Sequence, residues 1–141
     1  MSSDPTTAPV PTTVVRRPLD PPPSSSVGEH VLILDDRGTL ALTADLLLGR
    51  EPSTHPDVQQ GLRRGLLIVD ETNAVSRHHL AVSIHHDGVD VTDLASANGT
   101  MIVDGATGEA SPLVPRRATR LAIGDHVHLG ARSFQLGYRH T

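Results

Sequence analysis

"LAVSIHHDGVDVTDL" (residues 80–94) is the stretch that decides the fold of this sequence. Apolar residues alternate with polar ones on both sides of the pair Asp87-Gly88. An alternation with a period of two is typical of a β-strand, and Asp-Gly is a strong signal for a two-residue hairpin turn. The stretch therefore predicts an antiparallel β-hairpin that turns at Asp87-Gly88.

Short apolar segments of the same kind lie on both sides of this hairpin, separated by turn residues. They are "HVLILDD" (30–36), "TLALT" (39–43), "DLLLGR" (45–50), "LLIVD" (66–70), "RLAIGDHVHLG" (120–130) and "RSFQLGYR" (132–139). Many short strands joined by tight turns indicate an antiparallel sandwich or barrel, not an α/β enzyme. The long loop at 51–65 has room for one helical turn at most, because Pro56 and Gly61 limit it.

The first 28 residues have a different composition from the rest of the chain. Seven of them are proline and nine are serine or threonine, with few large apolar residues. Such a stretch cannot bury enough surface to offset the entropy lost on ordering. We expect a disordered tail or linker over 1–28 and one β-domain over 29–141.

The overall composition excludes several classes of function. The net charge of −4 argues against a general nucleic-acid binder, and only Phe134 and Tyr138 are aromatic. There is no cysteine, no apolar run of membrane-spanning length and no signal-peptide pattern at the N-terminus. The expectation is a cytoplasmic protein without insertion into a membrane. All 12 basic residues are arginine, whose planar fork suits carboxylates and phosphates.

The nine histidines raise the question of a metal site. His85 and His86 are adjacent on a predicted strand, so they point to opposite faces. His126 and His128 share a face at a spacing that metal ligands use, but no third ligand is evident. We therefore expect no metal. A His/Asp metal hydrolase on a β-sandwich remains the enzyme alternative, and bound metal after purification would reveal it.

Five motifs, in one order, resemble the forkhead-associated (FHA) domain family in its bacterial type. They are Gly49-Arg50, Ser76-Arg77-His78-His79, "DLASANGT" (93–100), Gly124-Asp125 and Leu129-Gly130. The resemblance covers about residues 29–139. It implies an eleven-stranded antiparallel β-sandwich that binds a phosphothreonine peptide with loops at one end. It also implies no enzymatic activity, no cofactor and no metal.

The resemblance assigns a role to each motif residue. Arg50 and Ser76 match the residues that bind the phosphate, Arg77 a position that adds a polar contact, and Asn98 the asparagine that binds the peptide backbone. The chemistry fits, because arginine donates two parallel charge-assisted hydrogen bonds and an amide both donates and accepts. The residues that match the scaffold of the binding loops are Gly49, His79, Gly99 and Thr100.

Two features depart from the family pattern. Ala97 stands where the family often has Thr or Ser with a hydroxyl that reaches the phosphate, and such a loss costs about 1–3 kcal/mol if nothing replaces the donor. The loop after Arg50 is long and brings Thr54, His55 and the pair Arg63-Arg64 near the expected binding end, where the two arginines either restore charge or are solvated.

The implied partner is a phosphothreonine-containing protein or peptide, with a serine/threonine protein kinase upstream. Two alternatives stay open. Ala97 favours a phosphate-independent adaptor with a degenerate site. The tail threonines Thr12 and Thr13 are candidate phosphorylation sites, which favours a switch in which the phosphorylated tail occupies its own domain. The tail lacks the acidic run expected of such a site.

Overall fold

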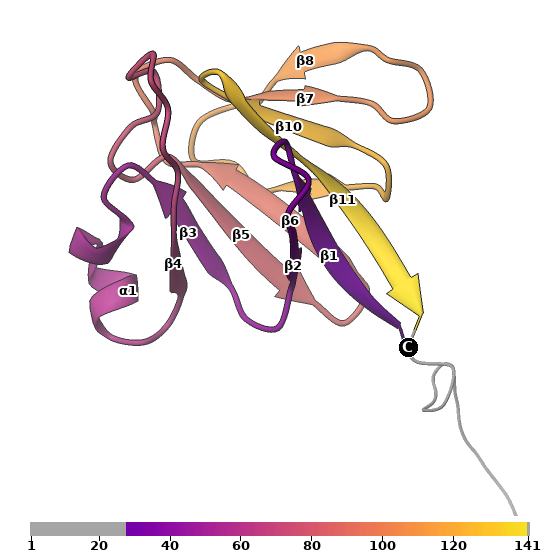
Figure 1. Cartoon of the computed structure of the whole chain (residues 1–141), viewed down its shortest axis with the longest axis horizontal. Helices are drawn as coiled ribbons and strands as arrows, with labels where there is room; N and C mark the ends of the chain where they lie inside the picture. The colour runs from indigo at the N-terminus through magenta and orange to yellow at the C-terminus, as the bar shows by residue number, and fades with distance from the viewer. Residues whose placement is uncertain (1–27, 141) are drawn as a thin grey trace, which may run out of the picture. The chain divides into compact units, whose positions relative to one another are not determined.

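The computed structural model of the chain describes residues 28–140 (Figure 1). The expected tail lies outside the described residues except for Gly28, and so do Thr12 and Thr13. The elements are β1 (Gly28–Leu34), β2 (Thr39–Ala41), β3 (Leu46–Gly49), a 3-10 turn η3 (Pro52–Thr54), α1 (Pro56–Gln59), β4 (Arg64–Leu67), β5 (Leu80–His85), β6 (Gly88–Asp93), β7 (Met101–Val103), β8 (Ala110–Pro112), β9 (Thr119–Leu121), β10 (His126–Leu129) and β11 (Arg132–His140).

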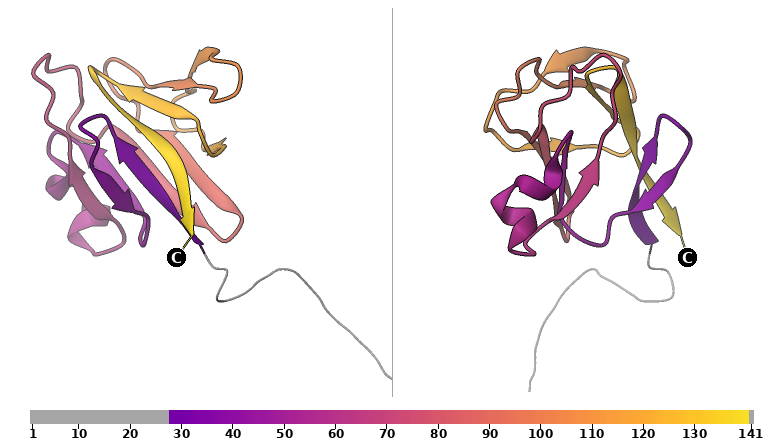
Figure 2. Two further views of the ribbon diagram at one scale, coloured as in Figure 1. Left: turned by 45° about the vertical axis from the view of Figure 1, so that its right-hand side comes forward. Right: turned by 60° about the vertical axis from the view of Figure 1, so that its left-hand side comes forward.

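These strands form two sheets, as the sequence predicts for an all-β sandwich (Figure 2). One sheet has the order β2-β1-β11-β10-β7-β8 and the other β4-β3-β5-β6-β9. Every pair with a described register is antiparallel except β3 and β4, which are parallel. The exception follows from the long 51–65 segment, because a parallel partner requires a crossover connection.

The core between the sheets is almost entirely aliphatic. Each central strand points alternate residues inward, so Leu46 and Leu48 of β3 and Val82 of β5 are buried there. The other sheet contributes Leu32, Val127, Leu129 and Leu136, with Phe134 as the one aromatic member of the buried cluster among the described residues. Apolar burial of this kind provides the main stabilisation, at roughly 25 cal/mol per Å².

The β5–β6 hairpin forms, but its turn differs by one residue from the prediction. His85 pairs with Gly88, so the two turn residues are His86 and Asp87 instead of Asp87 and Gly88. The observed register places Val82 opposite Val91 and Ile84 opposite Val89. A turn at Asp87-Gly88 would have placed Val82 opposite Asp93. Apolar cross-strand pairs thus outweigh the local preference of the Asp-Gly pair.

The 51–65 segment packs on the outer face of the five-stranded sheet, beside β3 and β4 (Figure 1). Its single helical turn, α1, begins at Pro56, and the imidazole Nδ1 of His55 accepts a hydrogen bond from the N–H of Asp57 at 3.0 Å. Arg63 then donates to the carbonyls of Leu46 at 3.3 Å and Val82 at 3.0 Å. The segment is therefore fixed to the sheet by side chains, and β4 begins at Arg64 instead of at the predicted residue 66.

Two strands escape the sequence pattern. β7 and β8 are three residues each, and β8 reads Ala-Ser-Pro with all three residues exposed. Both strands exist because β7 pairs with β10 and β8 pairs with β7. β8 carries no apolar alternation of its own, and β7 is a run of three apolar residues in which Ile102 packs against the core.

The chain divides into two units. The larger unit is His30–Gly137 and contains the core and all the motifs. The smaller one includes Gly28, Glu29 and Tyr138–His140, in which the Arg139 guanidinium lies 2.7 Å from the Glu29 carboxylate. No helix among residues 28–140 is long and apolar enough to span a membrane.

Candidate functional site

The site begins where β3 ends at Gly49-Arg50 and meets the loop before β5. The N–H of Arg50 donates to the carbonyl of Ser76 at 2.9 Å, and the N–H of Glu51 donates to that of Arg77 at 3.1 Å. This pairing brings the loop across Gly49 so closely that an added Cβ would stand 2.7 Å from the carbonyl carbon of Arg77 and closer still to its oxygen. Glycine at position 49 is thus required by the approach of the loop that carries Ser76.

His79 connects the two loops that precede β5 and β7. The N–H of Ser76 donates to Nδ1 of His79 at 3.0 Å, so that nitrogen carries no proton. The proton of the neutral ring is then on Nε2, which lies 3.0 Å from the carbonyl oxygen of Gly99 and donates to it. His79, which is 0% exposed, therefore holds its two partners by accepting one hydrogen bond and donating the other.

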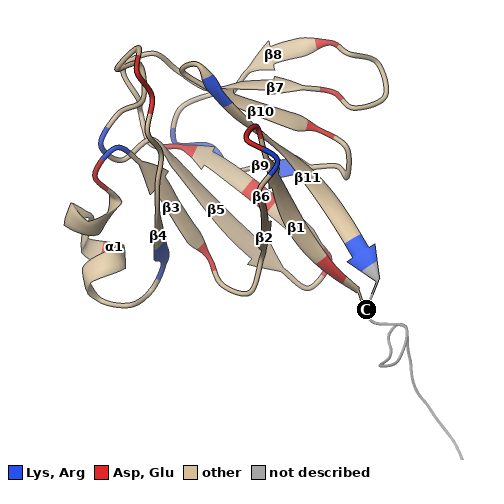
Figure 3. Cartoon of the chain, viewed as in Figure 1, with Lys and Arg blue, Asp and Glu red and all other residues tan. Residues whose placement is uncertain are grey.

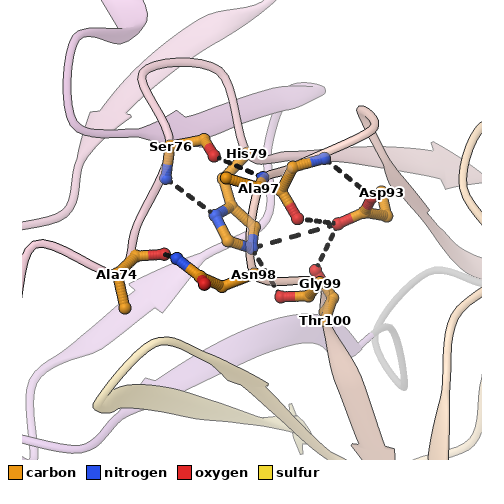
Figure 4. A network of polar contacts seen from close by, with 9 residues as sticks. Ala74, Ser76, His79, Asp93, Ala97, Asn98, Gly99 and Thr100 are labelled. Carbon is orange, nitrogen blue, oxygen red and sulfur yellow. Dashed lines mark hydrogen bonds and ion pairs between the residues drawn. The ribbon is translucent and has the colours of Figure 1, made fainter.

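Asp93, at the end of β6, organises the second of these loops (Figure 4). Its carboxylate is 1% exposed and accepts hydrogen bonds from the hydroxyl of Thr100 at 2.7 Å and from the hydroxyl of Ser96 at 2.6 Å. The N–H of Ser96 donates to it as well, at 3.0 Å. Thr100 braces the loop, as the resemblance implies, and Asp93 is the acceptor that it braces against.

Burial and charge fix the protonation states in this network. Burial lowers the pKa of His79 below its ordinary value of 6.5, against the opposing effects of the Gly99 carbonyl and the Asp93 charge. Burial would raise the pKa of Asp93, but the hydrogen bonds from Ser96 and Thr100 outweigh it and leave that pKa below 3.8. His79 is neutral and Asp93 is ionised at neutral pH, which is the state that the hydrogen bonds require.

The loops carry a polar cavity of about 450 Å³. Its lining consists of Arg50, His55, Ser76, Arg77, His78, Leu94 and Arg116, without a carboxylate among them. Glu51 lies just outside, 3.8 Å from the Arg50 guanidinium and 3.7 Å from that of Arg77. All three of these side chains are about half exposed or more, so these contacts are weak. The cavity is positively charged and open to an anion.

The hydroxyl of Ser76 is set up as a donor to this cavity. The N–H of Ala97 donates to Ser76 Oγ at 3.0 Å, which fixes the oxygen and leaves its own proton free. Ala97 thus contributes through its main chain. The Nε of Arg50 is directed to the carbonyl of Val75 at 3.4 Å, so the terminal nitrogens of the guanidinium remain available.

Asn98 and Gly99 complete the loop before β7. The side-chain amide of Asn98 donates to the carbonyl of Ala74 at 3.1 Å, which ties this loop to the one that carries Ser76. Gly99 has a φ of +79°, in the left-handed region that favours glycine. In addition to the expected peptide contact, Asn98 therefore has a structural contact of its own.

The two neighbouring histidines His55 and His78 form another edge of the cavity. Their rings meet edge to face at 4.8 Å between centroids. The hydroxyl of Thr54 donates to the carbonyl of Glu51 at 2.8 Å, so it accepts from Nε2 of His78 at 2.7 Å. Burial, together with the nearby His55 and Arg77, lowers the pKa of His78. His55 thus lines the cavity, and Thr54 contacts His78 beside it.

The sequence model of the FHA-domain family matches residues 46–130, which is more than half of the chain and contains every cavity-lining residue. The chain belongs to the FHA-domain family. No curated protein is significantly similar to it in sequence. This match confirms the family that the order of the motifs predicted.

Several solved FHA domains share the fold. One, studied for phosphothreonine-dependent FHA domain interactions, is 26% identical with a TM-score of 0.53 and covers 77% of this chain and 95% of its own. The FhaA FHA domain, solved with the intracellular domain of another protein, is 24% identical with a TM-score of 0.54 and covers 76% and 98%. EmbR of Mycobacterium tuberculosis, solved with a low-affinity phosphopeptide, is 22% identical with a TM-score of 0.54 and covers 77% of this chain and 24% of its own.

The FHA fold brings together residues that the sequence placed in separate motifs. Arg50, Ser76 and Arg77 line one cavity, whereas the scaffold residues Gly49, His79, Gly99 and Thr100 surround it. Arg63 is not part of the cavity, because its guanidinium is bonded to the sheet. Sequence reasoning missed Arg116, whose only signal was a Pro-Arg-Arg run, and it missed the role of Asp93, which stands inside a motif that was read for its asparagine.

Proposed function

We propose that this FHA domain is an interaction module that binds a phosphothreonine in a partner protein or peptide. The observation that carries the proposal is the cavity in which two family-motif arginines and a serine hydroxyl converge without a carboxylate in the lining. The solved relative studied for phosphothreonine-dependent interactions supports the same ligand. The proposed activity is binding, with no catalytic step.

The charges of the cavity match those of the ligand. A phosphothreonine carries a charge of about −1.5 to −2 and three acceptor oxygens. Arg50 donates through its free guanidinium nitrogens, and Ser76 donates the proton that its hydrogen bond from Ala97 leaves free. Arg77, which lies 3.7 Å from Glu51, adds the second positive charge. Asn98 keeps its amide oxygen for the peptide backbone beside the phosphothreonine.

A serine/threonine kinase upstream and a cytoplasmic location belong to the same proposal. They are supported by the family of the chain and by its composition, which lacks cysteine. A phosphate-independent adaptor is not favoured, because the loops that position Ser76 are held together through His79 and the main chain of Ala97.

The test is fluorescence anisotropy with a degenerate phosphothreonine peptide library, beside phosphoserine and unphosphorylated libraries. We expect binding confined to the phosphothreonine library. Arg50→Ala should raise Kd about 100-fold, since it removes two charge-assisted hydrogen bonds of about 1.5–3 kcal/mol each, of which solvent screening returns a part.

Arg64→Ala is the matched control, because Arg64 is equally exposed but lies in β4, outside the cavity. It should leave Kd within about twofold, the range expected of surface substitutions. Equal binding of phosphorylated and unphosphorylated peptides, or an Arg50→Ala variant that binds as the parent does, would refute the proposal.

A further inference from the structure

A third arginine, Arg116, lies in the wall of the same cavity. It belongs to the loop between β8 and β9 and has a φ of +68°, a conformation that non-glycine residues rarely adopt. Its N–H donates to the main-chain carbonyl of Asp93 at 2.8 Å. The residue whose carboxylate holds Ser96 and Thr100 therefore also holds Arg116, so this arginine has a fixed place relative to the binding loops.

The Arg116 guanidinium has no ionic partner within residues 28–140. By contrast, Arg50 and Arg77 both have Glu51 nearby, and Arg63 has Asp57 at 3.4 Å. Figure 3 shows arginine-bearing loops gathered at the end of the sheet where β3 and β6 finish. An exposed arginine that is held by its backbone, faces a cavity and lacks a carboxylate is arranged to bind an anion from outside the chain.

Arg116 stands at the junction of two cavities. The second cavity, of about 300 Å³, runs over the outer face of the five-stranded sheet between Leu47 and the 51–65 segment. Arg116, His55 and Leu94 line both cavities, and the second is also lined by Asp57, whose carboxylate is paired with Arg63 at 3.4 Å. His55 accepts from Asp57 through Nδ1, so its neutral ring has a proton to donate on Nε2. Two donors therefore lie beyond the part of the cavity that Arg50, Ser76 and Arg77 form.

A single phosphate already has two guanidinium groups to bind it without Arg116. Arg50 and Arg77 face the charge of about −1.5 to −2 of one phosphothreonine, with Glu51 offsetting part of their own charge. We propose that Arg116, with His55 beside it, binds a second acidic group of the same peptide. That group is a carboxylate of Asp or Glu, or a second phosphate, on a residue near the phosphothreonine. The inference rests on the proposed phosphothreonine binding and assigns a specificity to it.

The experiment uses the whole chain and one phosphothreonine peptide that binds the parent protein and has neutral flanking residues. Aspartate is placed at each flanking position in turn, and the best position is then also tested as phosphoserine. At one position, we expect aspartate to tighten binding by about tenfold, the effect of one well-placed charge pair across an interface. A larger gain with phosphoserine identifies a second phosphate as the preferred group, and a larger gain with aspartate identifies a carboxylate.

Arg116→Gln should abolish this gain and weaken the acidic peptide about tenfold more than the neutral one. The matched control is Arg117→Gln, which removes the same charge from the next residue, outside both cavities. It should retain the gain. Thermal melting of both variants confirms that they are folded, and Arg116→Lys, which keeps the charge but loses the planar fork, should recover part of the gain.

Three outcomes would overturn the inference, and they can be told apart. If Arg116→Gln weakens the neutral peptide as much as the acidic one, Arg116 binds the first phosphate and no second group. If no acidic position improves binding of the parent protein, there is no such subsite, while phosphothreonine recognition stands. If no phosphothreonine peptide binds at all, the proposed function fails and the subsite fails with it.

Discussion

At the scale of single residues, the site depends on a few atoms whose positions are fixed by single hydrogen bonds or by close packing. Ser76 has one proton to give because the N–H of Ala97 fills its acceptor position. His79 uses one ring nitrogen as acceptor and the other as donor. Position 49 has no room for a side chain, because the carbonyl of Arg77 stands where the Cβ would lie.

Gly49→Ala should therefore push the loop that carries Ser76 and Arg77 away from the end of β3. The added methyl group meets main-chain atoms, which cannot rotate away, so the loop of Ser76 and Arg77 must shift. We expect a loss of about 1–3 kcal/mol in the free energy of unfolding, as for overpacked positions, together with loss of phosphopeptide binding. Urea denaturation and anisotropy measure the two effects. Gly38→Ala is the control, because its φ is not positive and a methyl group added there meets only side-chain atoms, at 3.0 Å or more. Parent-like binding by Gly49→Ala would contradict the assigned role.

Ala97→Thr tests the departure from the family pattern. Position 97 is exposed and its N–H already holds Ser76, so a hydroxyl added there has room beside the proposed phosphate. One new hydrogen bond to a charged group should tighten phosphothreonine binding about tenfold. Ala97→Val has nearly the same shape without the hydroxyl and should give no gain. A gain with both variants would mean that the methyl groups act, not the hydroxyl.

At the scale of elements, the long 51–65 segment is a cover for the outer face of β3. It buries Leu47, which points away from the core, and it turns the chain so that β4 pairs in parallel with β3. Arg63 fixes it through hydrogen bonds to Leu46, Val82 and the hydroxyl of Ser83 at 3.1 Å. One end of this segment carries His55 into the cavity, so its attachment supports the site indirectly.

Arg63→Met keeps the aliphatic stem of the side chain and removes these hydrogen bonds. We expect the free energy of unfolding to fall by about 1–3 kcal/mol, because two strand carbonyls lose a charged donor. Hydrogen exchange should rise over residues 51–65 and little elsewhere. Arg64→Met, one residue along and exposed, is the control. Unchanged exchange over the segment would show that apolar packing alone holds it.

At the scale of the whole molecule, stability should depend on pH through His79. Its pKa is lowered by burial, so between that pKa and 6.5 the unfolded chain binds more protons than the folded one. Stability is then complete above pH 6.5 and falls as the pH drops below that value. A protonated ring also cannot accept from Ser76, so phosphopeptide binding should weaken at a lower pH still, below the pKa that His79 has in the folded protein.

Thermal melts in steps from neutral to mildly acidic pH measure this effect. His79→Gln should show a lower melting temperature at neutral pH but a flatter dependence on pH, because its contribution is gone while those of His30 and His78, whose pKa values burial also lowers, remain. His128→Gln changes an exposed histidine and should keep the parent slope. An unchanged slope in His79→Gln would place the pH dependence on another group.

The strand pattern and the family were predictable from the sequence, and the motif residues Arg50, Ser76 and Arg77 line one cavity. These features were predictable because apolar alternation and turn residues act locally, and because close-packed loops require particular residues at fixed spacing, as Gly49 and His79 illustrate. The sequence could not predict β7 and β8, which are three residues each and form by pairing with neighbouring strands, or the exact turn of the β5–β6 hairpin, which cross-strand pairs decide.

Only the tertiary structure decided which charges share a cavity. Arg63 and Arg116 belong to a residue type that is usually exposed, and both lie outside the helices and strands. The neighbouring sequence does not distinguish the role of one from that of the other. Folding bonds Arg63 to two strands and brings Arg116, anchored on the carbonyl of Asp93, to the wall beside Arg50 and Arg77. The reason is that a side chain's role in binding depends on the distance and direction between atoms far apart along the chain, which the packing of two sheets sets and local preference does not.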